Sequence, residues 1–249
     1  MKSTYRPDID GLRALAVLLV ILFHLDPERV PGGYIGVDVF FVISGYLITQ
    51  RILAHREAGT WSLLGFYAGR IRRLVPAATA VLALTLLASA LTLDPGLMAS
   101  TGQAGLSALF SVSNLYFWSS SGYFDVGAAS RPLLHTWSLG VEEQFYLGWP
   151  VLLGLLMPRD RWRIFLPLLI AGSTLWAEQV IGRGEAETAF FLPQFRFAEL
   201  GVGGLLGLWR STRLEAASWL PPRAETAVLG FALGGLIALG LTLDEHTRF

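Results

Sequence analysis

Long apolar runs separated by short polar stretches make up most of this chain of 249 residues. An α-helix needs about 20 apolar residues to cross a bilayer. Seven runs come close to that length. The pattern therefore predicts an all-α bundle with about seven membrane-spanning helices, at residues 10–25, 34–53, 76–94, 138–157, 164–182, 189–209 and 225–243.

An eighth apolar segment, residues 102–118, is interrupted by glycine, serine and asparagine. Such a segment can cross the membrane, or it can re-enter and return where protein or water covers its backbone. Basic residues mark cytoplasmic loops. They precede the first predicted helix and follow the helices at 34–53, 138–157 and 189–209. All four groups share one side only if 102–118 does not cross, so we expect a re-entrant segment and a cytoplasmic N-terminus.

The composition strengthens the membrane interpretation and excludes several kinds of site. Hydrophobic residues make up 53% of the chain and charged residues 15%, whereas soluble domains have about 25% charged residues. Mean hydropathy is +0.52. A net charge of zero gives no argument for a nucleic-acid partner. The chain has no cysteine, and its four histidines are scattered, so we expect no metal site.

Arg13 and His24 lie at opposite ends of the apolar run 12–25, which is otherwise uncharged. Eleven residues are close to three helical turns, so the two side chains share a face and lie roughly 16 Å apart along the axis. Ionisable groups in a membrane helix indicate a functional site, and imidazole is a general base near neutral pH. The alternatives are a histidine hydrogen-bonded at a helix end and an arginine that reaches the membrane interface.

Arg70 and Arg73 lie three residues apart, so they share a helix face. Two neighbouring guanidinium groups suit a diphosphate. The alternatives are a topology signal and the binding of anionic lipid headgroups. We expect residues 66–73 to form an amphipathic helix on the inner membrane surface.

Three carboxylates complete the candidate set. Asp38 lies in the first turns of the second predicted helix, where it could orient an imidazole or pair with the positive helix N-terminus. Glu142 and Glu143 enter another apolar helix and need a cavity or partners there. Successive helix residues point about 100° apart, so only one of the two faces a given site. Arg196 and Glu199 are expected to form a structural pair inside the helix at 189–209.

These motifs, in this order, resemble those of the integral-membrane acyltransferase 3 family, which includes bacterial O-antigen acetylases. The Arg-x10-His signature is formed by Arg13 and His24. Further matching motifs lie in residues 5–14, 32–47, 70–76, 132–146 and, more weakly, 192–200. The resemblance implies a single membrane domain over residues 1–249 of a protein in the bacterial inner membrane.

The resemblance also implies a reaction: transfer of an acyl group, usually acetyl, from cytoplasmic acyl-CoA to a hydroxyl of a carbohydrate or glycolipid. His24 would be the catalytic base, and Arg13 would assist it or bind the donor. Arg70 and Arg73 would contact the phosphates of CoA. A further set of residues would support the site or the acceptor, namely Asp38, Glu142 and Glu143.

The sequence departs from the family in two respects. Members often carry another arginine where this chain has Gly69, and the chain stops before the late Ser-Tyr and His-x-Pro motifs. We therefore expect a domain that is incomplete at its C-terminus. Two other functions stay open from the residues alone: a small-molecule transporter, whose polar residues would line a permeation path, and a non-catalytic membrane scaffold.

Overall fold

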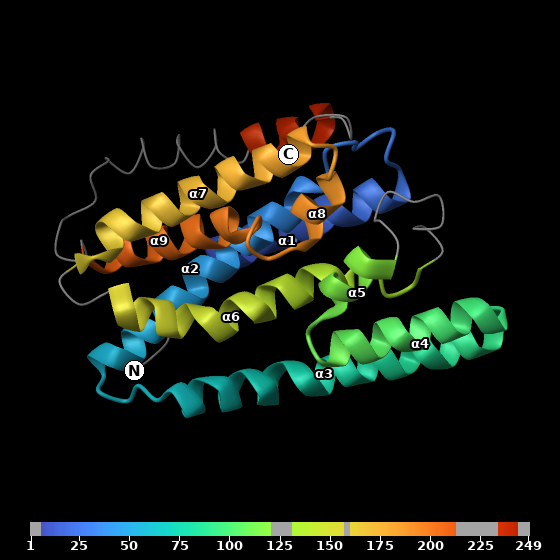
Figure 1. The fold of residues 1–249 in the computed structure, drawn as a ribbon, viewed down its shortest axis with the longest axis horizontal. Helices are drawn as coiled ribbons and strands as arrows, with labels where there is room; N and C mark the ends of the chain where they lie inside the picture. The colour runs from blue at the N-terminus through green and yellow to red at the C-terminus, as the bar shows by residue number, and fades with distance from the viewer. Residues whose placement is uncertain (1–5, 121–130, 157–159, 213–233, 244–249) are drawn as a thin grey trace. The chain divides into compact units, whose positions relative to one another are not determined.

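The computed structural model describes residues 6–120, 131–156, 160–212 and 234–243, and every long regular element in these ranges is helical (Figure 1). The predicted all-α class is confirmed. Residues 234–242 also form a helix. The labelled helices are α1 (Pro7–Leu25), α2 (Ile35–Glu57), α3 (Leu63–Thr92), α4 (Pro95–Leu109), α5 (Ser113–Ser120), α6 (Thr136–Leu156), α7 (Trp162–Gly182), α8 (Ala186–Phe191) and α9 (Phe197–Thr212).

Among the described residues, three helices are long and apolar enough to cross a membrane: α2, α3 and α7. The count of seven spans therefore stays a prediction. Much of the span predicted at 225–243 lies outside the described residues, and only its last part is seen as helix.

Two predicted boundaries are wrong. The span predicted at 189–209 is two helices, because α8 ends at Phe191 and α9 begins at Phe197. Pro193 explains the break, since the residue before a proline is driven out of the α conformation, and Leu192 is extended, with φ −87° and ψ 133°. The amphipathic helix expected at 66–73 is not separate from the span at 76–94. Both belong to the continuous helix α3, which Ser62 caps and which passes through Pro76.

The described chain divides into two compact units, each described by itself: residues 1–50 with 202–249, and residues 51–201. In the first unit, glycines let α1 and α2 approach closely. A β-carbon on Gly33 would collide with the carbonyl oxygen of Leu19, and one on Gly36 with that of Ala16. These pairs run in opposite directions along the two helices, so α1 and α2 are antiparallel. Small residues at the contact are typical of helix packing in membranes.

The other face of α2 packs against α9 in the same way. A β-carbon on Gly203 would collide with the carbonyl oxygen of Val42, and one on Gly207 would lie 3.0 Å from Cβ of Thr49. The side chain of Gln50 donates a 2.7 Å hydrogen bond to the carbonyl oxygen of Gly207. These contacts increase together along both helices, so the first-unit part of α9 runs parallel to α2.

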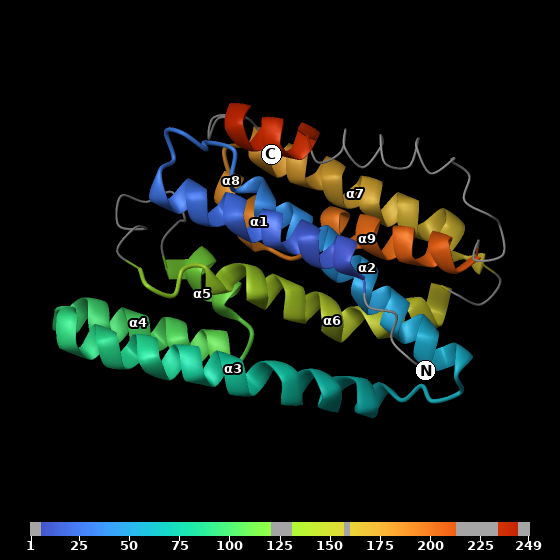
Figure 2. The same ribbon diagram turned by 180° about the vertical axis from the view of Figure 1, so that it is seen from behind.

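In the second unit, α3 and α4 lie side by side, as both views show (Figures 1 and 2). The chain then breaks at residues 110–112, where Ser111 has a φ of +58°. After this break α5 returns along α4, because the hydroxyl of Tyr116 donates to the carbonyl oxygen of Ser100. The segment predicted at 102–118 is thus a helical hairpin. Its re-entrant position in a membrane stays a prediction.

A buried amide pair holds this hairpin against α6. Asn114 is fully buried and donates to the carbonyl oxygen of Phe191 at 3.1 Å. Gln144 of α6 donates to the side-chain oxygen of Asn114 and to the carbonyl oxygen of Ser111, both at 2.8 Å. The carbonyl group of Ser111, at the break in the helix, thereby gains a hydrogen-bond donor.

Candidate functional site

His24 lies in the last turn of α1, and its ring nitrogen Nδ1 is 2.8 Å from the carbonyl oxygen of Val20. A carbonyl oxygen can only accept a hydrogen bond, so Nδ1 carries the proton in this contact. In the neutral imidazole, Nε2 is then the nitrogen with the free lone pair. The side chain is exposed in the described structure, which leaves Nε2 open to a second molecule.

Arg13 lies in the same unbroken helix, as predicted. Its guanidinium is 3.9 Å from the carboxylate of Asp10, and the two side chains are 43% and 51% exposed. An ion pair that is long and this exposed contributes little to stability. Arg13 is therefore held only loosely and keeps donors for another anion.

The helix register places Asp38 on the side of α2 that packs against α9. Asp38 shares a face with Val42 and Tyr46, at spacings of four and eight residues. The glycine that contacts α1, Gly36, lies two residues earlier, about 200° around the helix. The suggestion that Asp38 orients the imidazole of His24 stays a prediction, and this register does not supply support for it.

Sequence reasoning missed the contacts of Arg6. Its Nε donates to the carboxylate of Asp8 at 2.8 Å, and its Nη1 donates to the hydroxyl of Tyr46 at 3.4 Å. The hydrogen bond from Arg6 lowers the pKa of Asp8 from 3.8 to about 2. Arg6 ties the start of α1 to α2, and no local sequence signal marks a contact across 40 residues.

In the second unit, Arg70 of α3 and Glu143 of α6 form an ion pair at 2.7 Å. The side chains are only 13% and 19% exposed. The guanidinium also lies 3.7 Å from the centre of the Tyr146 ring, and the hydroxyl of Tyr146 donates to Glu142. The structure thus separates the adjacent carboxylates: Glu143 binds the arginine directly, whereas Glu142 binds the tyrosine on which that arginine stacks.

A third arginine joins this part of α3. A β-carbon built on Gly69 would lie 3.6 Å from Nη2 of Arg51, so the guanidinium of Arg51 lies beside the glycine. Gly69 and Arg73 are one turn apart and share a face. Arg73 itself is exposed. Arg51 was not among the predicted site residues, although the missing arginine at position 69 was a signal that another cation could fill the space.

The expected pair of Arg196 and Glu199 is present at 3.2 Å, with Arg196 just before α9 rather than inside a helix. Arg196 is 7% exposed on its side chain. Its Nε donates to the carbonyl oxygen of Phe190 at 3.1 Å. These bonds hold the turn between α8 and α9, which fits the structural role expected for the pair.

The predicted site residues fall into two groups. Arg13, His24 and Asp38 belong to the first unit, and the second unit brings together Arg70, Glu142 and Glu143 with Arg73 on the same helix as Arg70. Within the described ranges, no cluster of histidine and acidic residues could hold a metal ion.

The sequence is similar to a known family and to several bacterial proteins. A family model described as an acyltransferase domain matches residues 6–247. YrhL of Bacillus subtilis, provisionally named a peptidoglycan O-acetyltransferase, is 36% identical over 98% of this chain and 40% of its own length. The peptidoglycan O-acetyltransferase OatA of Listeria monocytogenes is 35% identical over 92% of this chain and 37% of its own length.

The O-acetyltransferase OatA of Staphylococcus aureus is 37% identical over 69% of this chain and 28% of its own length. The chain therefore spans about two fifths or less of the length of these relatives. No solved structure matches it. The family match covers almost the whole sequence and includes the Arg13 and His24 signature, so the chain belongs to the acyltransferase 3 family of acyl-transferring proteins.

Proposed function

We propose that this chain is the membrane domain of an O-acyltransferase in the bacterial inner membrane, with its N-terminus in the cytoplasm. It moves an acyl group, acetyl in the simplest case, from cytoplasmic acyl-CoA to a hydroxyl of a cell-surface glycan. The names of the relatives favour a polysaccharide of the cell wall as acceptor. The observation that carries the proposal is the hydrogen bond from Nδ1 of His24 to Val20, because it leaves Nε2 as the base.

In the proposed reaction, Nε2 of His24 takes the proton of the acceptor hydroxyl while the hydroxyl oxygen attacks the thioester carbonyl carbon. The carbon–sulfur bond then breaks, and the leaving thiolate takes the proton from the imidazolium. The products are the glycan ester and free CoA, and His24 returns to its neutral form. The hydrogen bond from Nδ1 to Val20 stabilises the imidazolium, because the protonated ring still has a donor at that position.

The donor side of the proposal rests on the arginines of the second unit. Arg51 and Arg73 flank Gly69 and offer guanidinium groups that match the phosphates of CoA. Arg70 is neutralised by Glu143 and stacked on Tyr146, so its part is to shape this surface. The proposed supporting role of Glu142 and Glu143 is to hold Arg70 in place. Arg13 is only loosely paired with Asp10, and we propose it as a further contact with acyl-CoA.

The test is transfer of labelled acetyl from acetyl-CoA to a panel of glycans by the purified chain in lipid. His24→Gln should lower the rate roughly a hundredfold or more, the range found when a general base is removed. It should leave folding and CoA binding unchanged. His55→Gln is the matched control, because His55 is an exposed histidine bonded to Thr60.

Transfer by the His24→Gln variant at the wild-type rate would overturn the base assignment. A transporter would instead show movement of solute without consumption of acyl-CoA. A scaffold would neither bind CoA nor respond to either substitution.

Arg73→Gln should raise the KM for acetyl-CoA roughly tenfold with kcat little changed, as expected for the loss of a hydrogen bond to a charged group.

A further inference from the structure

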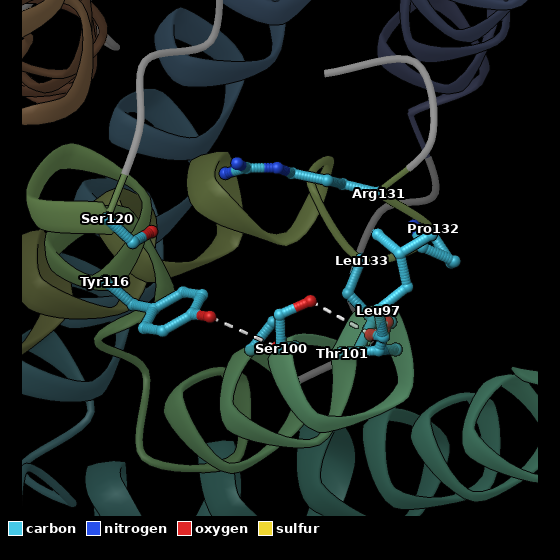
Figure 3. A pocket seen from close by; sticks show the side chains of 9 residues that line it. Leu97, Ser100, Thr101, Tyr116, Ser120, Arg131, Pro132 and Leu133 are labelled. Carbon is cyan, nitrogen blue, oxygen red and sulfur yellow. Dashed lines mark hydrogen bonds between the residues drawn. The ribbon is translucent and has the colours of Figure 1, made fainter. Parts of the chain in front are cut away.

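The α4–α5 hairpin and the turn at residues 131–133 line a partly open cavity of about 120 Å³ within the second unit (Figure 3). This volume holds several water molecules. Five of the nine residues on its wall carry polar side-chain groups, and the other four are apolar. The lining includes four hydroxyl groups and one guanidinium group, from Ser100, Thr101, Tyr116, Ser120 and Arg131.

Three of these hydroxyl groups already donate a hydrogen bond to a main-chain carbonyl oxygen. Ser100 and Thr101 both donate to the carbonyl oxygen of Leu97, at 2.9 and 2.7 Å. Tyr116 donates to the carbonyl oxygen of Ser100 at 3.2 Å. A hydroxyl whose proton is engaged still has lone pairs. This wall of the cavity is therefore a set of hydrogen-bond acceptors, which suits a ligand that carries O–H donors.

Arg131 provides hydrogen-bond donors and a positive charge. Its side chain extends along the cavity across from Tyr116 and Ser100 (Figure 3). Among the residues that the structure describes, no carboxylate forms an ion pair with it. Guanidinium is a planar donor that matches a carboxylate through two parallel hydrogen bonds. The cavity therefore combines one site for an anion with neighbouring sites for hydroxyl groups.

We propose that this cavity binds an acidic sugar through its carboxylate and the adjoining hydroxyls, and that it is the acceptor subsite of the enzyme. The second half of this statement rests on the function proposed above. Arg131 binds the carboxylate. Ser100, Thr101 and Tyr116 accept hydrogen bonds from the sugar hydroxyls.

The position of the cavity fits an acceptor that arrives from the side opposite to CoA. Gly105 of α4 borders both Leu133, which lines the cavity, and Leu86 of α3. Leu86 follows Arg70 by sixteen residues on the same helix, which is about 24 Å along its axis. The hydrocarbon core of a bilayer is about 30 Å thick. Arg70 and the part of α3 that lies beside the cavity are thus separated along the helix by most of that thickness.

The experiment measures binding of D-glucuronate, D-glucose and acetate to the full chain in lipid nanodiscs by saturation-transfer NMR and calorimetry. Glucuronate should bind at least roughly tenfold more tightly than either other probe. Only glucuronate carries both a carboxylate for Arg131 and hydroxyl groups for the acceptors on the opposite wall. Arg131→Gln should remove that advantage, and Thr101→Val should weaken glucuronate binding severalfold. Arg183→Gln, which removes an exposed arginine after α7, is the matched control for loss of charge.

Equal binding of glucuronate and glucose, or unchanged glucuronate binding in Arg131→Gln, would overturn the cavity assignment. Thr101→Val tests the same site without altering charge, so a folding defect in one variant does not decide the outcome. A separate assay measures acetyl transfer to an acidic and to a neutral glycan. Selective glucuronate binding without any transfer would refute the enzyme function and keep the sugar site. Transfer whose KM for the acidic glycan is unchanged in Arg131→Gln would refute the acceptor subsite and leave the enzyme function standing.

Discussion

At the scale of the residue, the partner of a charged side chain decides what that side chain can do. The sequence shows that Arg70, Glu142 and Glu143 are unusual in apolar helices. It does not show which carboxylate pairs with the arginine, because that pairing joins residues 73 positions apart. Arg51 illustrates the same limit, since its place beside Gly69 depends on a turn between α2 and α3. His24 is different, because its partner Val20 is local and one turn away.

Removal of the carboxylate from the ion pair tests this distinction. Glu143→Gln should lower the free energy of unfolding by about 2 kcal/mol, because it removes a hydrogen bond between charged groups and leaves a largely covered guanidinium without its counter-charge. Glu142→Gln should cost less, since a glutamine oxygen still accepts the hydrogen bond from Tyr146. Reversible denaturation in detergent measures both. Equal losses in the two variants would show that the pairing in the structure does not govern stability.

The N-terminal arginine offers a prediction on pH. The hydrogen bond from Arg6 stabilises ionised Asp8, whose pKa is about 2. This contribution is present above the ordinary pKa of 3.8 and is lost as the pH falls through about 2. NMR titration of the Asp8 carboxyl should therefore show a midpoint near pH 2 in the native chain. In Arg6→Gln the midpoint should move up towards its ordinary value, and an unchanged midpoint would refute the bond.

At the scale of the element, apolar runs predict where helices lie better than where they end. Helices α1, α2, α6 and α7 occupy the predicted runs, because length and hydropathy are local properties. The break before Pro193 can be predicted from the sequence, since a proline disfavours the α conformation in the residue before it. The break at Ser111 was signalled only by polar residues. Its geometry comes from Asn114 and Gln144, which are 30 residues apart.

The glycine contact between α2 and α9 gives the element-scale prediction. Gly203→Ala should lower the free energy of unfolding by about 1–3 kcal/mol, because the new methyl group collides with the backbone of Val42. Gly172→Ala, in α7, has open space around it and should raise stability by roughly 0.5–1 kcal/mol. Thermal unfolding in the same detergent compares the two variants. A stabilised Gly203→Ala protein would exclude the close approach of the two helices.

At the scale of the whole molecule, membrane topology is the main open prediction. The chain has no cysteine, so single cysteines can be introduced directly into the wild-type sequence. In intact cells, an impermeant maleimide should label Leu93→Cys and Ser119→Cys, at the two ends of the α4–α5 hairpin, and should not label Thr60→Cys. If residues 102–118 cross the membrane, Ser119→Cys will be protected while Leu93→Cys is labelled. Thr60→Cys in permeabilised cells controls for reactivity.

The imidazole of His24 is held by a main-chain oxygen, and this has a consequence for how such a protein can evolve. No substitution of the Val20 side chain removes that oxygen, so the helix itself maintains the ring orientation. The residues around the imidazole can therefore diverge while the ring keeps its tautomer. If the proposed sugar cavity is correct, homologous chains should vary first at the residues that line it and should keep His24 together with the helical backbone that holds it.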